Sequence, residues 1–214
     1  KDNQFAFSYF ELAFEQAPTA DRRVGFRADL GVGPTATWVN STDPDGGTLK
    51  YLQQGYVSVL APVGKGLQID AGKFNTPIGA EPTETAYNWN YSRSLLFSWA
   101  APYYHVGVRA TLPVTDAVTV SGFLINGWNN AQDNNRAKTM AAQVAWKLTP
   151  SLTVSQAWMG GPEGPNGASS TSAARPSAAR RRSGMAWPGM PGCPCCPRGP
   201  CRRASRSSRI VMDS

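Results

Sequence analysis

Residues 1–163 contain no cysteine and no long apolar run. All four cysteines of the chain lie between residues 193 and 201, so the longer part of the sequence has no disulfide framework. Its longest apolar stretches fall far short of the about 20 residues that a membrane-spanning helix needs. The sequence also opens without an initiator Met or a charged-then-apolar leader, and we expect a cut N-terminus with any export signal upstream. These absences argue against a helical membrane protein and against a disulfide-rich domain.

Residues 1–163 carry no excess of basic residues. Residues 164–214 hold nine Arg, no Lys and one acidic residue, so they contribute +8 to the formal net charge of +7 and leave −1 for residues 1–163. A nucleic-acid-binding face requires basic residues on a folded surface. We therefore expect no nucleic-acid partner.

Apolar and polar residues alternate with a period of two in eight segments. The clearest runs from Val24 to Val32, where apolar residues occupy the even positions and Gly25, Arg27, Asp29 and Gly31 the odd ones. Such alternation gives a β-strand one apolar and one polar face. The same pattern predicts strands over residues 10–15, 56–61, 67–72, 104–112, 118–125, 140–148 and 152–158.

The connections between these segments alternate between short and long. Pro18, Pro62, Pro113 and Pro150 stand at the short connections, where proline stops the hydrogen-bond ladder. The long connections, rich in Asn, Asp, Gly and Thr, span residues 33–50, 75–102 and 127–136. Tight turns at one end and long loops at the other are typical of an up-and-down membrane barrel.

Aromatic residues gather at strand ends beside the long connections. Amphipathic rings at this height are expected of the interfacial girdle of a membrane barrel. Aromatic residues also favour strands of any kind, so both interpretations stay open. The residues are Trp38, Tyr51, Phe74, Trp99, Tyr103, Tyr104, Trp128 and Trp158.

Four motifs carry a family resemblance. They are AGKFNTPIG at residues 71–79, NWNYSRSLLF at 88–97, PYYHVGVR at 102–109 and NGWNN at 126–130. As a set they resemble the OmpL-like family of outer-membrane β-barrel porins, over residues 5–163. The resemblance implies a barrel in the outer membrane of a Gram-negative bacterium, with membrane lipid around it and small polar solutes or ions as cargo. It implies no cofactor and no catalytic residue, and it is compatible with a homo-oligomer.

The predicted fold is all-β: an antiparallel up-and-down transmembrane β-barrel, incomplete, with about eight strands within residues 1–163. Residues 164–214 are mostly Ala, Arg, Gly, Pro, Ser and Cys, with no Phe or Tyr and no alternation. GC-rich codons give these residue types when they are read in the wrong frame. We therefore expect a disordered non-family tail produced by a frameshift near Gly164, and its cysteines lack the paired spacing of a zinc site.

The polar faces of the strands supply the candidate pore lining. If the apolar faces contact lipid, side chains of both charges line the lumen and tune ion preference without a tight ligand site. Internal ion pairs that fill a narrow barrel are the alternative interpretation of the same residues. The lining candidates are Arg27, Asp29, Gln68, Asp70, His105, Arg109, Thr111, Gln143 and Lys147.

The long connection over residues 75–102 is a candidate constriction loop. Folded inward, it would bring Glu81, Glu84 and Arg93 into the pore, whereas an exposed surface loop is equally compatible with its composition. His105 is the only histidine and so lacks the partner ligands of a metal site and offers no catalytic triad. We expect no enzymatic activity, no bound metal and no cofactor.

The predicted function is passive diffusion of small polar solutes or ions through a water-filled lumen. The alternative is a soluble β-barrel that binds a ligand or carbohydrate, in which the apolar residues would face inward. An enzyme built on a barrel would need a Ser, His and acid cluster that the sequence does not offer. An open sheet leaves backbone groups that lipid cannot satisfy, so we expect the chain as written to be inactive as a monomeric pore.

Translation of the coding DNA across Glu163–Ser214 in all three frames tests the origin of the tail. We expect another frame to restore alternating strands and to end in an aromatic residue. If the present frame is confirmed and no other frame continues the pattern, the chain is a truncated or remodelled product, and a soluble or inactive protein becomes the leading hypothesis.

Overall fold

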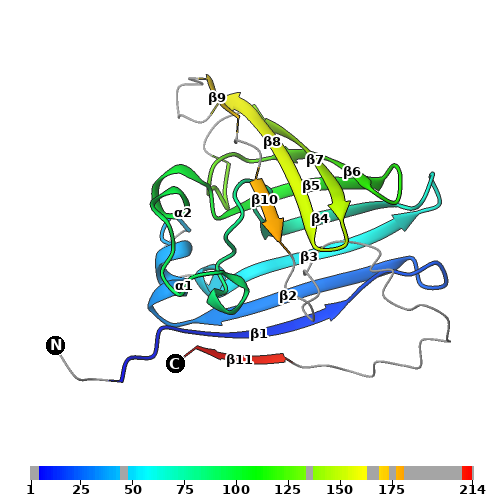
Figure 1. Ribbon diagram of the computed structural model, residues 1–214. Coiled ribbons are helices and arrows are strands. Elements are labelled where there is room, and N and C mark those ends of the chain that lie inside the picture. The colour runs from blue at the N-terminus through cyan, green and yellow to red at the C-terminus, as the bar shows by residue number, and fades with distance from the viewer. Residues whose placement is uncertain are drawn as a thin grey trace.

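Eight consecutive strands form one antiparallel up-and-down sheet, in which neighbours in sequence are neighbours in space (Figure 1). The structure, a computed structural model, describes residues 5–43, 48–133, 137–162, 169–173, 177–180 and 209–213. The strands are β1 (Tyr9–Gln16), β2 (Val24–Val32), β3 (Leu52–Ala61), β4 (Leu67–Asn75), β5 (Tyr104–Pro113), β6 (Val118–Ile125), β7 (Thr139–Thr149) and β8 (Leu152–Pro162). The predicted all-β, up-and-down architecture is confirmed.

The helices lie in the long connections, at one end of the strands (Figure 1). They are α1 (Pro34–Val39) and η1 (Thr48–Tyr51) between β2 and β3, and η2 (Thr85–Tyr87) and α2 (Leu95–Ala100) between β4 and β5. The Ser94 side chain caps α2 by accepting a hydrogen bond from the Phe97 amide, which satisfies one of the unpaired donors of the first turn. Within the described residues, no helix is long and apolar enough to cross a membrane.

Three short strands follow β8. Strands β9 (Ser169–Ala173) and β10 (Ser177–Arg180) both pair with β8, and β11 (Arg209–Asp213) pairs with β1. The predicted disorder of the tail stays a prediction, because the structure describes only these three segments of residues 164–214. In the strand order β10 and β11 stand at opposite ends, so the described sheet is not closed.

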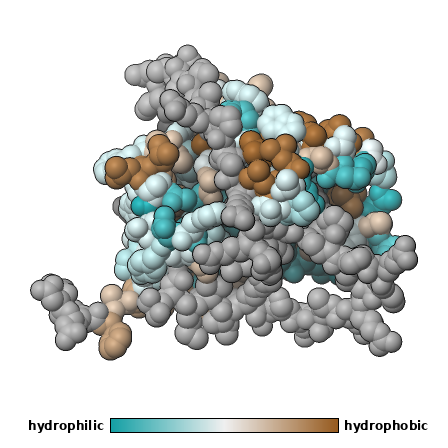
Figure 2. All heavy atoms as spheres, in the orientation of Figure 1, coloured by the Kyte–Doolittle hydropathy of each residue, from teal (hydrophilic) through white to brown (hydrophobic). Residues whose placement is uncertain are grey.

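The sheet buries its polar face and exposes its apolar face. We call the face that carries Arg27 and Asp70 the inner face, and the face that carries Val24 and Val57 the outer face. Asp70 is 1% exposed, whereas Val57 is 53% exposed. In the space-filling view, hydrophobic residues lie at the surface of the molecule (Figure 2). Exposed outer-face residues include Phe14, Val24, Phe26, Leu30, Val32, Val57, Val59, Val108, Val120, Leu124, Met140, Trp146 and Trp158.

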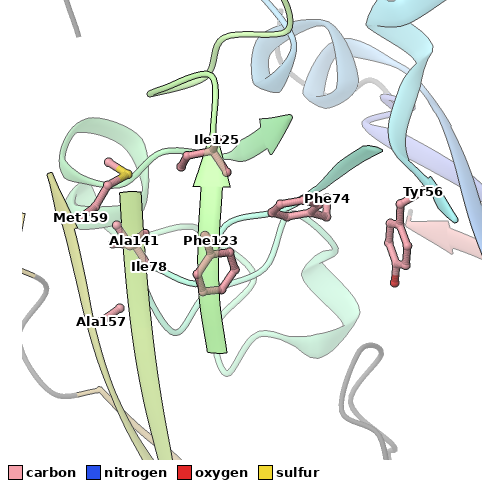
Figure 3. Packing of buried hydrophobic residues seen from close by; sticks show 8 residues of the cluster. All are labelled: Tyr56, Phe74, Ile78, Phe123, Ile125, Ala141, Ala157 and Met159. Atoms are coloured by element: carbon pink, nitrogen blue, oxygen red, sulfur yellow. The ribbon is translucent and has the colours of Figure 1, made fainter. Parts of the chain in front are cut away.

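One apolar cluster interrupts the polar inner face. Phe123 and Ile125 of β6 break the alternation of their strand, and both are buried in this cluster with Phe74 and Met159 (Figure 3). The cluster also contains Ile78, which follows the end of β4. Burial of each large apolar side chain contributes about 1.5–3 kcal/mol, so the inner wall at β6–β8 is a binding surface for the loop that carries Ile78.

Two glycines face each other across β4 and β5. Gly72 and Gly107 are register partners, and next to them on the inner face stand Tyr56 of β3 and Ile125 of β6. A Cβ atom at Gly72 would approach the Gly55 carbonyl oxygen to 2.2 Å, and its φ of 138° is one that other residues rarely adopt. Neither property suits a larger residue. On the inner face, β4 and β5 therefore carry only glycines between the bulky side chains of Tyr56 and Ile125.

The exposed apolar face predicts a test with two matched valines. Val57, in the middle of β3, and Val24, at the turn end of β2, are 53% and 55% exposed. The test uses the version of the chain whose residues after Glu163 are translated in the frame that restores alternation, refolded into phospholipid vesicles. Val57→Lys should lower its free energy of unfolding by about 2–4 kcal/mol, and Val24→Lys by about 0–1 kcal/mol, because the cost of a charge depends on its depth in the bilayer. Urea unfolding of the refolded variants measures both, and equal small effects would argue for a face in water.

Candidate functional site

The first charged group of the inner wall lies on β2. Arg27 donates through Nε to Oδ2 of Asp29 at 2.7 Å, and the Gln54 amide donates to the same oxygen at 2.6 Å. Glu15 of β1 lies 3.4 Å from the Arg27 guanidinium. Arg27 and Asp29 are 6% and 0% exposed, and a buried charge needs such a partner. The predicted lining residues of β2 are therefore joined as an ion pair.

The second charged group joins β4 to β5. Arg109 donates through Nε and a terminal nitrogen to Oδ2 of Asp70, at 2.9 and 2.6 Å. Ser58 and Gln68 donate to the other oxygen, Oδ1, at 2.6 and 2.8 Å. The predicted residues Gln68, Asp70 and Arg109 thus form one network, and every Asp70 oxygen has a donor.

Aromatic rings hold the Arg109 side chain in place. Its guanidinium carbon lies 4.9 Å from the centre of the Phe74 ring and 5.4 Å from that of Tyr56. Both distances are within the range of cation–π attraction. Both rings and the Asp70 carboxylate therefore fix the position of the guanidinium on the inner face.

His105 lies on the inner face but is fully buried. Its Nδ1 lies 2.9 Å from the Gly127 carbonyl oxygen, and its Nε2 lies 3.1 Å from the Thr76 hydroxyl. A carbonyl only accepts, so Nδ1 donates and Nε2 accepts in the neutral ring. Thr111, further along β5, shares a hydrogen bond with Ser121. Both predicted residues serve to hold the wall and its loops together.

The last two lining candidates lie on β7, Gln143 near its middle and Lys147 near its turn end. Gln143 donates to the Pro77 carbonyl at 2.9 Å, which places the loop against the wall. Lys147 shares the face of Gln143 by alternation, but it is exposed at the turn end of the strand, near Asp116. Of the predicted lining residues, Lys147 therefore lies at the rim and not within the wall.

The long connection between β4 and β5, residues 76–103, folds over the inner face; we call it the β4–β5 loop. Its first residues contact β5 through Thr76 and His105 and β7 through Pro77 and Gln143. Ile78 packs in the apolar cluster of β6–β8. Further along, Glu84 is 4% exposed and lies within electrostatic range of Arg27 and Asp29. The loop thus extends from the β5–β8 wall to the β1–β2 wall.

The three constriction candidates have different surroundings. Glu81 accepts hydrogen bonds from the amide and hydroxyl of Ser94, and Arg93 donates to the Thr83 carbonyl and to the Thr85 hydroxyl. These contacts are internal to the loop. Of the three, Glu84 is the one within electrostatic range of the opposite wall, and burial raises the pKa of its carboxyl above the ordinary value.

A further ionic cluster lies at the loop end of the sheet and was not among the predicted residues. Lys73 donates to Asp43 at 2.7 Å and to Asn40 at 2.8 Å, and its ammonium lies 3.9 Å from the centre of the Tyr104 ring. The Tyr104 hydroxyl donates to Asp43 and, at 2.9 Å, to the Asn129 carbonyl. By alternation Lys73 and Tyr104 lie on the outer face. We call Lys73, Asn40, Asp43 and Tyr104 the Lys73 cluster; it joins the β2–β3 loop to β4 and β5, and Tyr104 links it to the β6–β7 loop through Asn129.

Sequence reasoning also missed two buried polar residues on β1. Tyr9 donates its hydroxyl to Glu11, and these side chains are 1% and 5% exposed. Glu11 alternates with Phe10 and Leu12, so the period of two was a signal that could have found it. No described set of three or more His, Cys, Asp or Glu residues could hold a metal ion.

A comparison with protein families gives one result that bears on the whole site. A family model described as "Putative beta-barrel porin-2, OmpL-like" matches residues 1–183. The match extends at both ends beyond residues 5–163, over which the four motifs carry the resemblance. No curated protein and no solved structure gives a significant match.

The Lys73 cluster predicts a contrast between two Lys–Asp pairs. Removing one partner of a buried pair leaves an uncompensated charge, so Lys73→Met should lower the free energy of unfolding by about 3–5 kcal/mol. The Lys65–Asp116 pair is exposed, so Lys65→Met should give no measurable loss. Urea unfolding in detergent measures both variants, and a similar effect of the two would contradict the assigned role of the cluster.

Proposed function

The chain belongs to the beta-barrel porin-2, OmpL-like family, and on that premise we propose that it forms the wall of an outer-membrane pore for passive diffusion of small polar solutes or ions. Porin families act generally as channels of the outer membrane and not as enzymes. The finer parts of the proposal are the water-filled lumen along the inner face and the role of the β4–β5 loop as its constriction.

The direction of polarity is the observation that carries this proposal. Charged side chains such as Asp29, Asp70 and Arg109 lie on the buried inner face, whereas Val57 and Leu124 lie exposed on the outer face. A soluble barrel of the lipocalin kind puts its apolar residues inside, and large exposed apolar patches are unfavourable in water. Membrane barrels alternate between an apolar lipid face and a polar lumen face. The soluble ligand-binding alternative therefore loses its main support.

The charged residues of the inner wall fit both earlier interpretations, pore lining and internal ion pairs. Arg27 with Asp29, and Arg109 with Asp70, are ion pairs held by further hydrogen bonds. Paired charges of this kind still present polar groups to a passing solute. We propose that they do so without forming a tight ligand-binding site. We expect weak selectivity, set by the width of the lumen that the β4–β5 loop leaves open.

Conduction requires a closed barrel. The described sheet ends at β10 and β11 without joining them, and open sheet edges are not tolerated in lipid. We propose that the chain as written is non-functional as a monomeric pore, and that closure requires further strands in place of the tail.

Planar-bilayer recordings of two refolded proteins test the proposed function. The first is the chain as written, and the second is a version whose residues after Glu163 are translated in the frame that restores alternation. We expect stepwise single-channel currents from the second protein only, because its sheet can close. Currents from the chain as written would contradict the fragment proposal. A second protein that stays soluble without detergent and gives no current would contradict the porin proposal.

A further inference from the structure

The two parts of the β4–β5 loop are attached to the sheet in different ways. Near its start, Thr76 bonds to His105 at 3.1 Å and Pro77 accepts from Gln143 at 2.9 Å. Ile78 is 7% exposed in the apolar cluster. Two of these contacts, the Pro77–Gln143 hydrogen bond and the packing of Ile78, contain no ionisable group. These two contacts therefore hold this end of the loop without depending on the protonation of a side chain.

The tip of the loop, around Glu84, comes within electrostatic range of the β1–β2 wall, and η2, which follows Glu84, packs against β11. Glu84 is 4% exposed, and the groups within electrostatic range are Arg27 and Asp29 of β2 and Tyr9 and Glu11 of β1. On its own loop it faces Arg93. Glu84 has no ion-pair partner among the described residues, although it is almost fully buried.

The bases at the tip are already engaged. Arg27 is paired with Asp29 at 2.7 Å and lies 3.4 Å from Glu15, and Arg93 bonds to the Thr83 carbonyl and the Thr85 hydroxyl. The carboxyls of Glu84 and Glu11 are therefore left near each other and near Asp29. Burial raises the pKa of the Glu84 carboxyl, the Asp29 carboxylate adds to the rise, and Arg27 and Arg93 oppose it.

Hydrogen bonding at this contact is incomplete. Oδ1 of Asp29 on the wall and Nε of Arg93 on the loop are buried without a hydrogen-bond partner. Buried polar atoms of this kind destabilise the arrangement that buries them. The resting position of the tip is therefore destabilised by the unpaired Nε of Arg93, which belongs to the loop itself.

We propose that Glu84 is a proton-controlled latch: when its carboxyl carries a proton the tip of the β4–β5 loop rests on the β1–β2 wall, and when the proton leaves the tip withdraws while residues 76–78 stay attached. A buried carboxylate beside Glu11 and Asp29 is repelled, whereas a carboxylic acid is tolerated and can donate a hydrogen bond. As a gate for solutes the latch rests on the proposed function, but the movement of the loop does not.

The sign of the pH dependence follows from linkage. A carboxyl whose pKa is higher in the resting position than in the withdrawn one stabilises the resting position at low pH. The resting position weakens as the pH rises above the ordinary value of the carboxyl. Each tenfold difference between the two acid constants gives a tenfold change in the ratio of resting to withdrawn tips, so alkaline conditions open the lumen.

Hydrogen–deuterium exchange of the full chain in detergent micelles tests the latch without a channel assay. Rates are measured at pH 4 and pH 8 and corrected for the intrinsic pH dependence of exchange. We expect residues 80–93 to exchange about tenfold or more faster at pH 8, and residues 76–78 to exchange at the same corrected rate at both. Glu84→Gln, an uncharged mimic of the protonated state, should stay protected at both pH values.

Two further variants keep the test decisive. Glu81→Gln changes an acid whose contacts are internal to the loop, and it should respond to pH as the unmodified chain does. Glu11→Gln removes one repelling carboxylate, so the transition should move to higher pH. Equal corrected rates at pH 4 and pH 8, or a Glu84→Gln variant that responds like Glu81→Gln, would overturn the latch. A normal pH response in a protein without channel activity would leave the latch standing and contradict the proposed function alone.

Discussion

The opposition of the two faces of the strands is the constraint on which the other features depend. A period of two gives every strand an apolar and a polar side, and the sheet turns the polar side inward, where Asp29 and Asp70 are almost completely buried. Buried charges require partners, which explains why Arg27 and Arg109 stand within hydrogen-bonding distance of these acids. The ion pairs and the contacts of the loops with the wall both follow from this arrangement, in which the polar side faces inward.

Most of the fold could be predicted because the period of two is a local property of the sequence. The bounds of β2 and β6 match the alternating segments, whereas β3 begins at Leu52, four residues early. Gln53, Gln54 and Gly55 interrupt the alternation there, and the pairing with β2 continues to Leu52 through a register shift at Gln53. The helices α1 and α2 were not predicted. Each has six residues, and helices this short depend on packing against the rest of the molecule more than on intrinsic propensity.

The candidate site was predictable in its faces but not in its contacts. Alternation places Arg27, Asp70 and Arg109 on one side of the sheet, yet their pairing depends on the register between strands, which the sequence alone does not specify. The Lys73 cluster brings together residues 40, 43, 73 and 104 from separate loops and strands. Such contacts form only in the folded chain, so no local sequence pattern predicts them.

The course of the β4–β5 loop links strands that are not neighbours in the sheet. It leaves and re-enters the sheet through adjacent strands, yet its contacts reach β7 on one side and the charged wall of β2 on the other. Among β1–β8, the strands themselves pair only with their neighbours in sequence. Through Thr76 and Pro77 the loop therefore links β4 to β7, two strands that the backbone ladder does not join directly.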